Sequence, residues 1–196
     1  MGKRTTDPKA NILDDGDPVV KRLGQSIRQI PGFPRPGINF FDITTLLKDG
    51  KLFSEVINIF AARHTAPTGA ANGIRAVVGI ESRGFILGAA VAHALGVGFI
   101  PARKRGKLPA PVHSVNYSLE YGTDCVEIHR DALAPGDQVI VIDDLLATGG
   151  TAAATEALII QLGASIREFL FLIELKSLNG RRHLSQSPIF SLLMYD

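Results

Sequence analysis

The stretch Gln138–Thr151, which reads QVIVIDDLLATGGT, decides the fold of this chain. Residues 139–142 are an unbroken β-branched run, which is typical of a strand buried on both faces of a parallel sheet. Asp143 and Asp144 follow at the carboxyl end of this strand, and a loop of small residues then leads into an alanine-rich segment, 152–162, that favours a helix. The sequence therefore predicts a strand, an acidic pair, a small-residue loop and a helix in succession.

The loop between this strand and helix is suited to bind a phosphate group. Gly149 and Gly150 allow a tight turn and a close approach of the backbone to a ligand, and the first N–H groups of a helix lie at its positive dipole end. Asp143 and Asp144 would repel a phosphate, whereas carboxylates bind a ribose diol or a phosphate-bound Mg²⁺ well. We therefore expect a phosphorylated ribose here. The alternative, an ordinary strand-to-helix turn with a Thr cap, does not need paired acids and paired glycines in this order.

The composition narrows the class of protein. The chain has 196 residues, of which 45% are hydrophobic, and we expect a flexible N-terminal segment over 1–17 and a single α/β domain over 18–196. No apolar run is long enough to span a bilayer, and the net charge of +2 is too small for a nucleic-acid binder, so we expect neither partner. The single cysteine, Cys125, cannot form an internal disulfide, which fits the cytoplasm.

Periodicity and breaker residues predict the remaining elements. Asp17 and Pro18 are typical of the N-cap and first position of a helix, which we expect over 19–30. The Pro- and Gly-rich run 31–37 predicts an irregular loop with an exposed aromatic residue, Phe33. We further expect a short strand and a turn over 38–47, helices over 52–64 and 85–95, strands over 76–80, 97–101, 123–128, 169–173 and 189–195, and a turn at 135–137.

Basic residues follow two of the expected strands. Arg83 lies just after the strand at 76–80, where it either pairs with a neighbouring acid or binds a ligand anion. The run 103–107, which reads RKRGK, follows the next strand and could form a solvated edge or a nucleic-acid patch. The residue pattern alone leaves these alternatives open.

The opening stretch resembles the phosphoribosyl pyrophosphate (PRPP) motif of the type I phosphoribosyltransferases: a hydrophobic strand, two acids, two variable residues and Ala-Thr-Gly-Gly-Thr. The run 30–49 is similar to the N-terminal hood of the adenine phosphoribosyltransferases in that family. ESRGF at 81–85 and SLEYG at 118–122 resemble their pyrophosphate loop and catalytic loop. The resemblance implies an α/β type I phosphoribosyltransferase fold with a central, mostly parallel sheet flanked by helices, a hood at about 30–47 and a mobile catalytic loop at about 103–121.

The resemblance also implies an activity, in which adenine and PRPP are converted to AMP and pyrophosphate in purine salvage. Mg²⁺ would be carried by PRPP and reach the protein through Asp143 or Asp144. A homodimer is implied as well, with Arg103 able to act at the neighbouring subunit's site. Because the family often has a cis peptide before the serine of ESRGF, we expect one between Glu81 and Ser82.

Roles for individual residues follow from the same resemblance. Glu120 would be catalytic near N7 of the purine, Arg83 would be catalytic through pyrophosphate, and Tyr121 would serve loop closure. The ribose and its 5′-phosphate would be bound by Asp143, Asp144, Ala147, Thr148, Gly149, Gly150 and Thr151; pyrophosphate by Ser82, Arg83, Arg103, Lys104 and Lys107; and adenine by Phe33, Pro34, Arg35 and Leu145.

Two alternative functions fit the same residues less well. A transcriptional regulator could use this fold to sense PRPP, but the residues before the hood are too few and too acidic for a helix-turn-helix. A phosphoribosyltransferase for hypoxanthine, guanine or orotate is opposed by FPRPG at 33–37. Backbone groups at Arg35 could donate to adenine N1 and accept from its 6-amino group, and a 6-oxo purine would mispair with them.

Overall fold

The structure is a computed structural model that describes residues 17–66, 71–118, 123–184 and 187–196. The chain divides into two units, with the boundary between Phe53 and Ser54. Helix α3, Gly50–Ala62, contains this boundary, and each unit is described by itself. The expected single domain over 18–196 stays a prediction, and residues 1–16 lie outside the described residues.

The first unit begins with the predicted capped helix. Helix α1, Pro18–Ser26, starts after Asp17, whose Oδ1 accepts a hydrogen bond from the backbone N–H of Val19 at 2.8 Å. Proline suits the first helical position, because an N–H at that position would have no partner within the helix. Val20 and Leu23 are buried, so the helix packs through one apolar face.

A β-hairpin follows α1, where the sequence predicted more helix. The helix ends at Ser26 because residues 28–31 instead form strand β1, Arg28–Pro31, which pairs antiparallel with β2, Asn39–Asp42. Hydrogen bonding to a distant strand outweighs the local helical spacing, so the prediction of a helix to residue 30 was wrong. The short helix α2, Thr44–Leu47, then completes the first unit up to α3.

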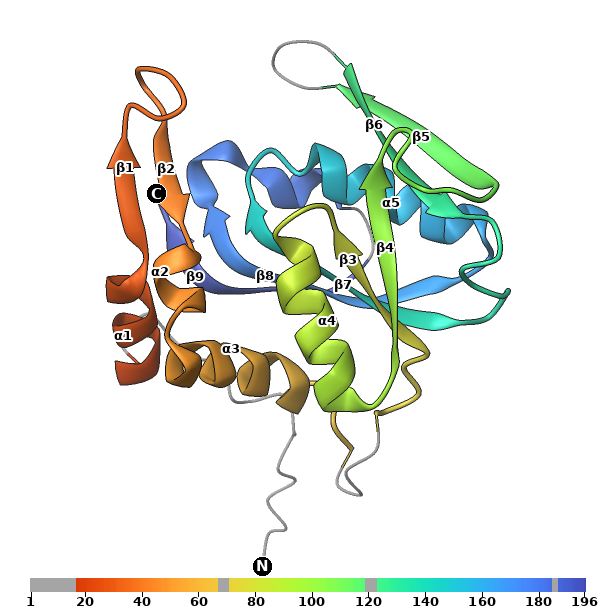
Figure 1. Ribbon diagram of the computed structural model, residues 1–196, viewed down its shortest axis with the longest axis horizontal. Coiled ribbons are helices and arrows are strands. Elements are labelled where there is room, and N and C mark those ends of the chain that lie inside the picture. Colours follow the sequence, from red (N-terminus) through yellow and green to blue (C-terminus); the bar gives the residue numbers. More distant parts are fainter. Residues whose placement is uncertain (1–16, 67–70, 119–122, 185–186) are drawn as a thin grey trace, which may run out of the picture. The chain divides into compact units, whose positions relative to one another are not determined.

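The second unit holds a seven-stranded sheet within the described residues, in the order β5-β6-β4-β3-β7-β8-β9 (Figure 1). Its strands are β3 (Ala76–Ile80), β4 (Gly98–Lys104), β5 (Val112–Ser118), β6 (Thr123–His129), β7 (Gln138–Leu146), β8 (Ser165–Leu175) and β9 (Ile189–Tyr195). The neighbours from β4 through β3, β7 and β8 to β9 are parallel, whereas β6 is antiparallel to both β4 and β5. The predicted mostly parallel sheet is therefore confirmed.

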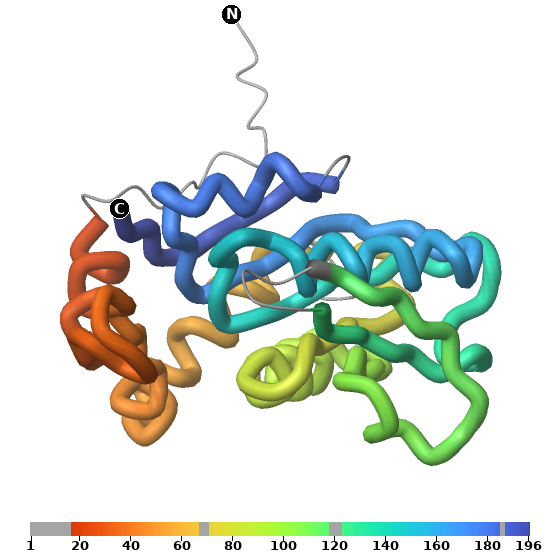
Figure 2. The backbone as a smooth tube through the Cα atoms, turned by 90° about the horizontal axis from the view of Figure 1, so that it is seen from above, coloured from red at the N-terminus to blue at the C-terminus, as the bar shows by residue number. Residues whose placement is uncertain are grey.

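Helices α4, Gly84–Leu95, and α5, Gly150–Gln161, lie on opposite faces of this sheet (Figures 1 and 2). The α4 face is closely packed, since a Cβ added at Gly88 would lie 3.3 Å from the Cα of Gly79 in β3. On the other face, alternate residues of β3 join the core that contains Ala154 and Leu158 of α5. Two short 3₁₀ helices, η1 (Lys176–Leu178) and η2 (Gly180–His183), connect β8 to β9. Among the helices of the described ranges, none has the length and apolar character that crossing a membrane requires.

The segment predicted as a mobile loop over 103–121 contains regular structure. Strand β4 runs on to Lys104, beyond the predicted end at residue 101, and β5 pairs with β6 along its whole length. The side chains of β5 alternate between partly buried, as at Val115, and exposed, as at Asn116. This period of two is a strand signal, so the loop prediction was wrong for residues 112–118. Mobility of the hairpin stays a prediction.

Candidate active site

The acidic pair of the opening stretch lies in the central part of the sheet. Asp143 belongs to β7 and stands opposite Phe171 of the parallel strand β8. Because β3 on the other side of β7 is also parallel, the pair lies at the edge where the carboxyl ends of the strands meet. Arg83, just before α4, reaches this edge, and its Nη2 lies 2.9 Å from Oδ2 of Asp144. Of the two alternatives for Arg83, the structure contains the acid pairing.

Burial dominates the electrostatics of the pair. It raises the pKa of Asp143 well above the usual value of 3.8, and the neighbouring charge of Asp144 adds to the increase. Burial also raises the pKa of Asp144, while the charge of Arg83 opposes that increase. Within the described residues, the buried Oδ2 of Asp144 accepts no hydrogen bond, although Arg83 is at ion-pair distance. The Oδ2 oxygen of Asp144 is therefore available to accept a hydrogen bond from a hydroxyl group or to contact a cation.

The glycine loop at 147–151 turns sharply against another segment of backbone. Gly149 has a φ of +84° and precedes the first residue of α5. A Cβ at this position would lie 2.4 Å from the carbonyl oxygen of Gly180 in η2, so only glycine fits here. Gly150 and Thr151 are the first residues of α5, and the loop presents a helix N-terminus as the sequence predicted.

A pocket of about 350 Å³ lies beside the acidic pair. It is lined by Glu81, Ser82, Arg83, Lys104, Asp143, Asp144 and Leu145. The peptide between Glu81 and Ser82 is cis, as expected. The pocket thus brings together residues predicted to bind ribose, pyrophosphate and adenine, which come from the loop between β3 and α4, from β4 and from β7.

A second pocket, of about 250 Å³, adjoins the first, because Glu81, Lys104 and Asp143 line both. Arg103 and Thr151, predicted to bind pyrophosphate and the 5′-phosphate, also line this second pocket. Two predicted anion-binding segments therefore meet at neighbouring cavities at the same edge of the sheet.

Glu81 holds Arg103 at this edge. Nε and Nη2 of Arg103 donate to the two carboxylate oxygens of Glu81 at 3.1 and 3.2 Å, and Nη1 donates to the carbonyl oxygen of Lys107 at 3.0 Å. The backbone N–H of Lys104 also donates to Glu81, at 3.0 Å. Burial alone would raise the pKa of Glu81, but the hydrogen bonds from Arg103 and Lys104 lower it. Lys107 contributes its backbone here and lines neither of the two pockets.

Asp124 of β6 pairs with Lys104, which was also predicted to bind pyrophosphate. Its Oδ2 lies 3.1 Å from Nζ of Lys104 and accepts a hydrogen bond from the hydroxyl of Tyr117 at 3.2 Å. Tyr117 and Thr151, at the start of α5, both line the second pocket. The contacts of Asp124 connect the hairpin of β5 and β6 to β4 beside this pocket.

Sequence reasoning missed Glu81, Asp124, Tyr117 and Cys125 as pocket residues. The position of Glu81 directly after a buried strand is the same signal that drew attention to Arg83, so it could have been found. Asp124 gave no such signal, because its contacts depend on how β4, β5 and β6 pair.

The remaining predicted residues are not brought to these two pockets. Thr148 and Gly150 line a third pocket of about 360 Å³ together with His183, and Tyr117 lines both this pocket and the second one. Glu120 and Tyr121 lie outside the described residues.

Phe33, Pro34 and Arg35 belong to the first unit, so their predicted meeting with Leu145 stays a prediction. Phe33 is 50% exposed and packs edge-on against Phe40, with ring centroids 5.1 Å apart.

Residues 42–179 match the family model of the phosphoribosyl transferase domain. This range includes the acidic pair, the glycine loop and both adjoining pockets. The fold and the site are therefore those of a phosphoribosyltransferase.

Comparison with known proteins narrows the class. Adenine phosphoribosyltransferase of Synechococcus sp. is 56% identical over 87% of this chain and 96% of that protein, and the enzyme of Roseiflexus sp. is 54% identical over 90% and 100%. The crystal structure of adenine phosphoribosyltransferase from Thermoanaerobacter pseudethanolicus has a TM-score of 0.84 and 44% identity over 90% of this chain and 99% of that one. The Saccharomyces cerevisiae enzyme, complexed with an imino-altritol bisphosphate and adenine, has a TM-score of 0.84 and 41% identity over 89% and 98%. The chain belongs to the adenine phosphoribosyltransferases.

Proposed function

We propose that this chain transfers the phosphoribosyl group of PRPP to adenine and releases pyrophosphate, forming AMP. The observation that carries the proposal is the pocket in which the acidic pair, Arg83 and Lys104 converge. The names of the relatives and the adenine bound in the yeast enzyme support the choice of base.

The basic residues act on the leaving group in this proposal. Breaking the bond between ribose C1 and pyrophosphate develops positive charge on the sugar and negative charge on the leaving group. Arg83, Arg103 and Lys104 lie at the adjoining pockets and would stabilise that negative charge. Arg83 pairs with Asp144 at 2.9 Å, which holds the guanidinium beside the pocket. Ribose hydroxyls that donate to Asp144 would compete with this pairing.

The carboxylates of Asp143 and Asp144 fit a Mg²⁺ ion whose other ligands come mostly from PRPP. Across the described ranges, no group of three or more His, Cys, Asp or Glu could hold a metal ion by itself. Asp143 and Asp144 offer carboxylate oxygens, one of them buried without a hydrogen bond, and Mg²⁺ usually takes one or two carboxylates with phosphate oxygens and water. Bound there, the ion would offset phosphate charge.

Base recognition and proton transfer are assigned to residues whose roles rest on family similarity. We propose that Phe33, Pro34, Arg35 and Leu145 contact adenine. Glu120 would manage the N7 proton as N9 attacks, and Tyr121 would help to exclude water, which is the competing nucleophile.

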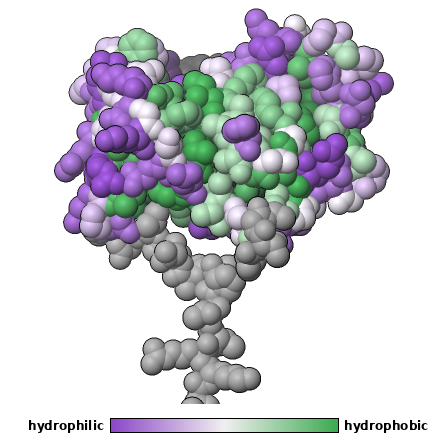
Figure 3. Space-filling model, turned by 60° about the horizontal axis from the view of Figure 1, so that its bottom comes forward, coloured by the Kyte–Doolittle hydropathy of each residue, from purple (hydrophilic) through white to green (hydrophobic). Residues whose placement is uncertain are grey.

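We further propose a homodimer that works in the cytoplasm. Hydrophobic side chains reach the surface in places on the face that Figure 3 shows. The large exposed hydrophobic residues of the described chain are Phe33, Ile86, Ile160, Leu178 and Met194. The homodimer is proposed from the similarity to the family, and the free, buried Cys125 suits a reducing compartment.

Product analysis with competing bases tests the proposal. Adenine, hypoxanthine, guanine and orotate are each incubated with PRPP, Mg²⁺ and the protein, and nucleotide formation is measured. We expect AMP only, and we expect Arg83→Ala to impair its formation by at least about 100-fold, as loss of one transition-state contact commonly does. Arg167→Ala, at an exposed arginine of β8, is the matched control and should be fully active. Activity on another base alone, or equal loss in both variants, would contradict the proposal.

A further inference from the structure

The β1–β2 hairpin carries the proposed adenine residues in its turn and a polar network at its base. Arg28 pairs with Asp42 at one end of the ladder, and Pro31 pairs with Asn39 at the other, next to the turn. Phe33 in this turn is half exposed, and its one described aromatic contact is Phe40 of β2. The direction in which the turn presents Phe33 therefore depends on how the base of the hairpin is held.

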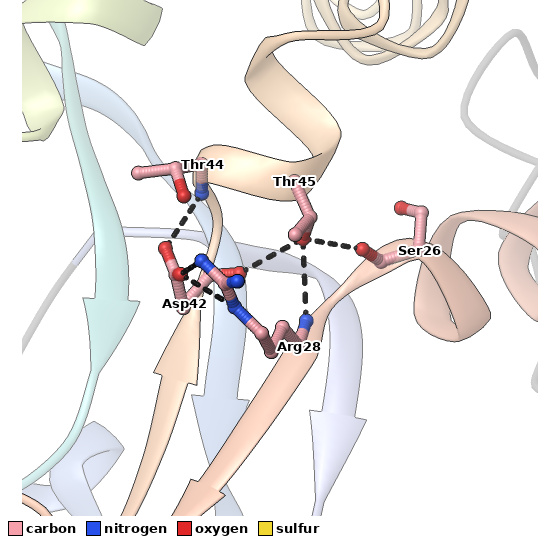
Figure 4. A network of polar contacts seen from close by, with 5 residues as sticks. All are labelled: Ser26, Arg28, Asp42, Thr44 and Thr45. Atoms are coloured by element: carbon pink, nitrogen blue, oxygen red, sulfur yellow. Dashed lines mark hydrogen bonds and ion pairs between the residues drawn. The ribbon is translucent and has the colours of Figure 1, made fainter.

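Asp42 joins three segments of the first unit (Figure 4). Its Oδ2 accepts hydrogen bonds from Nε of Arg28 at 3.0 Å and from Nη2 of the same guanidinium, which ties β2 to β1. Its Oδ1 accepts from the backbone N–H of Thr44 at 2.9 Å, which ties the hairpin to the start of α2. The Asp42 side chain is 11% exposed while that of Arg28 is 58% exposed, so the carboxylate is the inner member of the pair.

Thr45 extends the network to the end of α1 (Figure 4). Its hydroxyl donates to the carbonyl oxygen of Ser26 at 2.6 Å and accepts from the backbone N–H of Arg28 at 3.3 Å. The hydroxyl oxygen also lies 3.2 Å from the carbonyl oxygen of Asp42. Both strands of the hairpin are thus fixed at their base to the helices on either side.

The network is not a pH switch. Hydrogen bonds from Thr44 and then from Arg28 lower the pKa of Asp42 to about 2 from the usual 3.8. The carboxylate therefore stays ionised wherever the enzyme is assayed, and its effect should not change with pH in that range.

We propose that Asp42 is a positioning residue for base recognition, which holds the hairpin so that its turn presents Phe33 to adenine. The inference rests on the proposed function, because the contact of Phe33 with adenine belongs to it. Asp42 acts through the hairpin and not on PRPP, whose proposed ligands lie in the second unit. Its loss should therefore raise the KM for adenine and leave the KM for PRPP unchanged.

The test compares two substitutions with the same chemistry. Asp42→Asn keeps an acceptor for Thr44 and removes the charge that holds Arg28. Asp49→Asn is the matched control, because Oδ1 of Asp49 accepts from the backbone N–H of Lys51 at 2.9 Å in the same capping geometry, outside the hairpin. Arg28→Gln breaks the same ion pair by changing its more exposed member. It therefore tests the pair independently if Asp42→Asn does not fold.

Two readouts are taken for each variant: KM for both substrates and amide hydrogen exchange of the ligand-free protein. For Asp42→Asn and Arg28→Gln we expect the KM for adenine to rise roughly tenfold, the size expected for a lost charge-assisted hydrogen bond, with the KM for PRPP within about twofold of wild type. Exchange should increase in peptides covering 28–42 and stay unchanged elsewhere. Asp49→Asn should show neither change.

The contrary outcomes are distinct. Unchanged exchange over 28–42, or an equal rise of both KM values, would overturn the positioning role in an enzyme that still makes AMP. A wild-type protein that forms no AMP would overturn the proposed function, and the positioning role with it.

Discussion

Replacing Gly149 by alanine should destabilise the protein and weaken phosphate binding together. The φ of +84° lies in the left-handed region, where a non-glycine residue costs about 1–2 kcal/mol. The new Cβ would also lie 2.4 Å from the carbonyl oxygen of Gly180 and 3.1 Å from its carbonyl carbon. Both are backbone atoms, so relief requires the glycine loop or η2 to move, and such overpacking typically costs about 1–3 kcal/mol. The conformational strain and the overpacking together should lower the free energy of unfolding by about 2–5 kcal/mol.

The variant Gly136→Ala separates the conformational strain from the close contact. Its φ of +88° imposes the same conformational strain, but no atom lies within 4 Å of the added Cβ. In a chain of this size each kcal/mol shifts the Tm by roughly 2–4 °C. We therefore expect the Tm to fall by roughly 10 °C for Gly149→Ala and by roughly 4 °C for Gly136→Ala.

Thermal unfolding followed by circular dichroism gives the two Tm values, and calorimetric titration with ribose 5-phosphate gives the affinity. Gly149→Ala should bind the ligand at least about tenfold more weakly, because displaced N–H groups at the start of α5 no longer converge on the phosphate. Gly136→Ala should bind like wild type. Equal Tm values for the two variants would refute the close-contact argument, and wild-type affinity in Gly149→Ala would refute the phosphate role of the loop.

Two further predictions concern protonation. Burial and the charge of Asp144 raise the pKa of Asp143 above its usual value, so the folded protein releases that proton at higher pH than the unfolded chain, and stability falls as pH rises through this interval. Asp143→Asn should therefore raise the Tm at neutral pH and weaken PRPP binding by calorimetry; a lowered Tm would contradict the argument. Burial opposes ionisation of Glu168, but the adjacent His64 and Arg63 side chains lower its pKa from 4.5 to about 2. Its contribution, about 3 kcal/mol, is complete above pH 4.5 and lost as pH falls toward 2. Urea unfolding of Glu168→Gln should be less pH-dependent across that window, and an unchanged slope would rule out this source of acid lability.

The sequence was most informative for strands that are buried on both faces of the sheet. The apolar runs at 139–142 and 76–80 predicted β7 and β3, because only a central parallel strand needs no polar alternation. The end of α1 could not be predicted in this way, since residues 28–30 fit a helix locally and become part of β1 through its partner β2. Strand β5 carried a period of two, which the resemblance to a mobile loop outweighed.

At the site, residue types could be predicted but their partners could not. Asp143 and Arg83 stood out because charged residues at the end of a buried strand need a reason. The ion pair of Arg83 with Asp144 depends on contacts between segments distant in sequence. The same is true of the hydrogen bonds from Arg103 to Glu81. Local patterns contain no information on such contacts, so these became known only from the structure.

A crystal structure of the protein with AMP would test the central claim most directly. We expect the 5′-phosphate on the backbone N–H groups at Gly150 and Thr151, and the ribose hydroxyls on Asp143 and Asp144. We also expect that Arg83 then lies farther than 2.9 Å from Asp144, because the sugar has replaced it. AMP bound elsewhere, or a ribose that leaves the ion pair of Arg83 with Asp144 intact, would contradict the account.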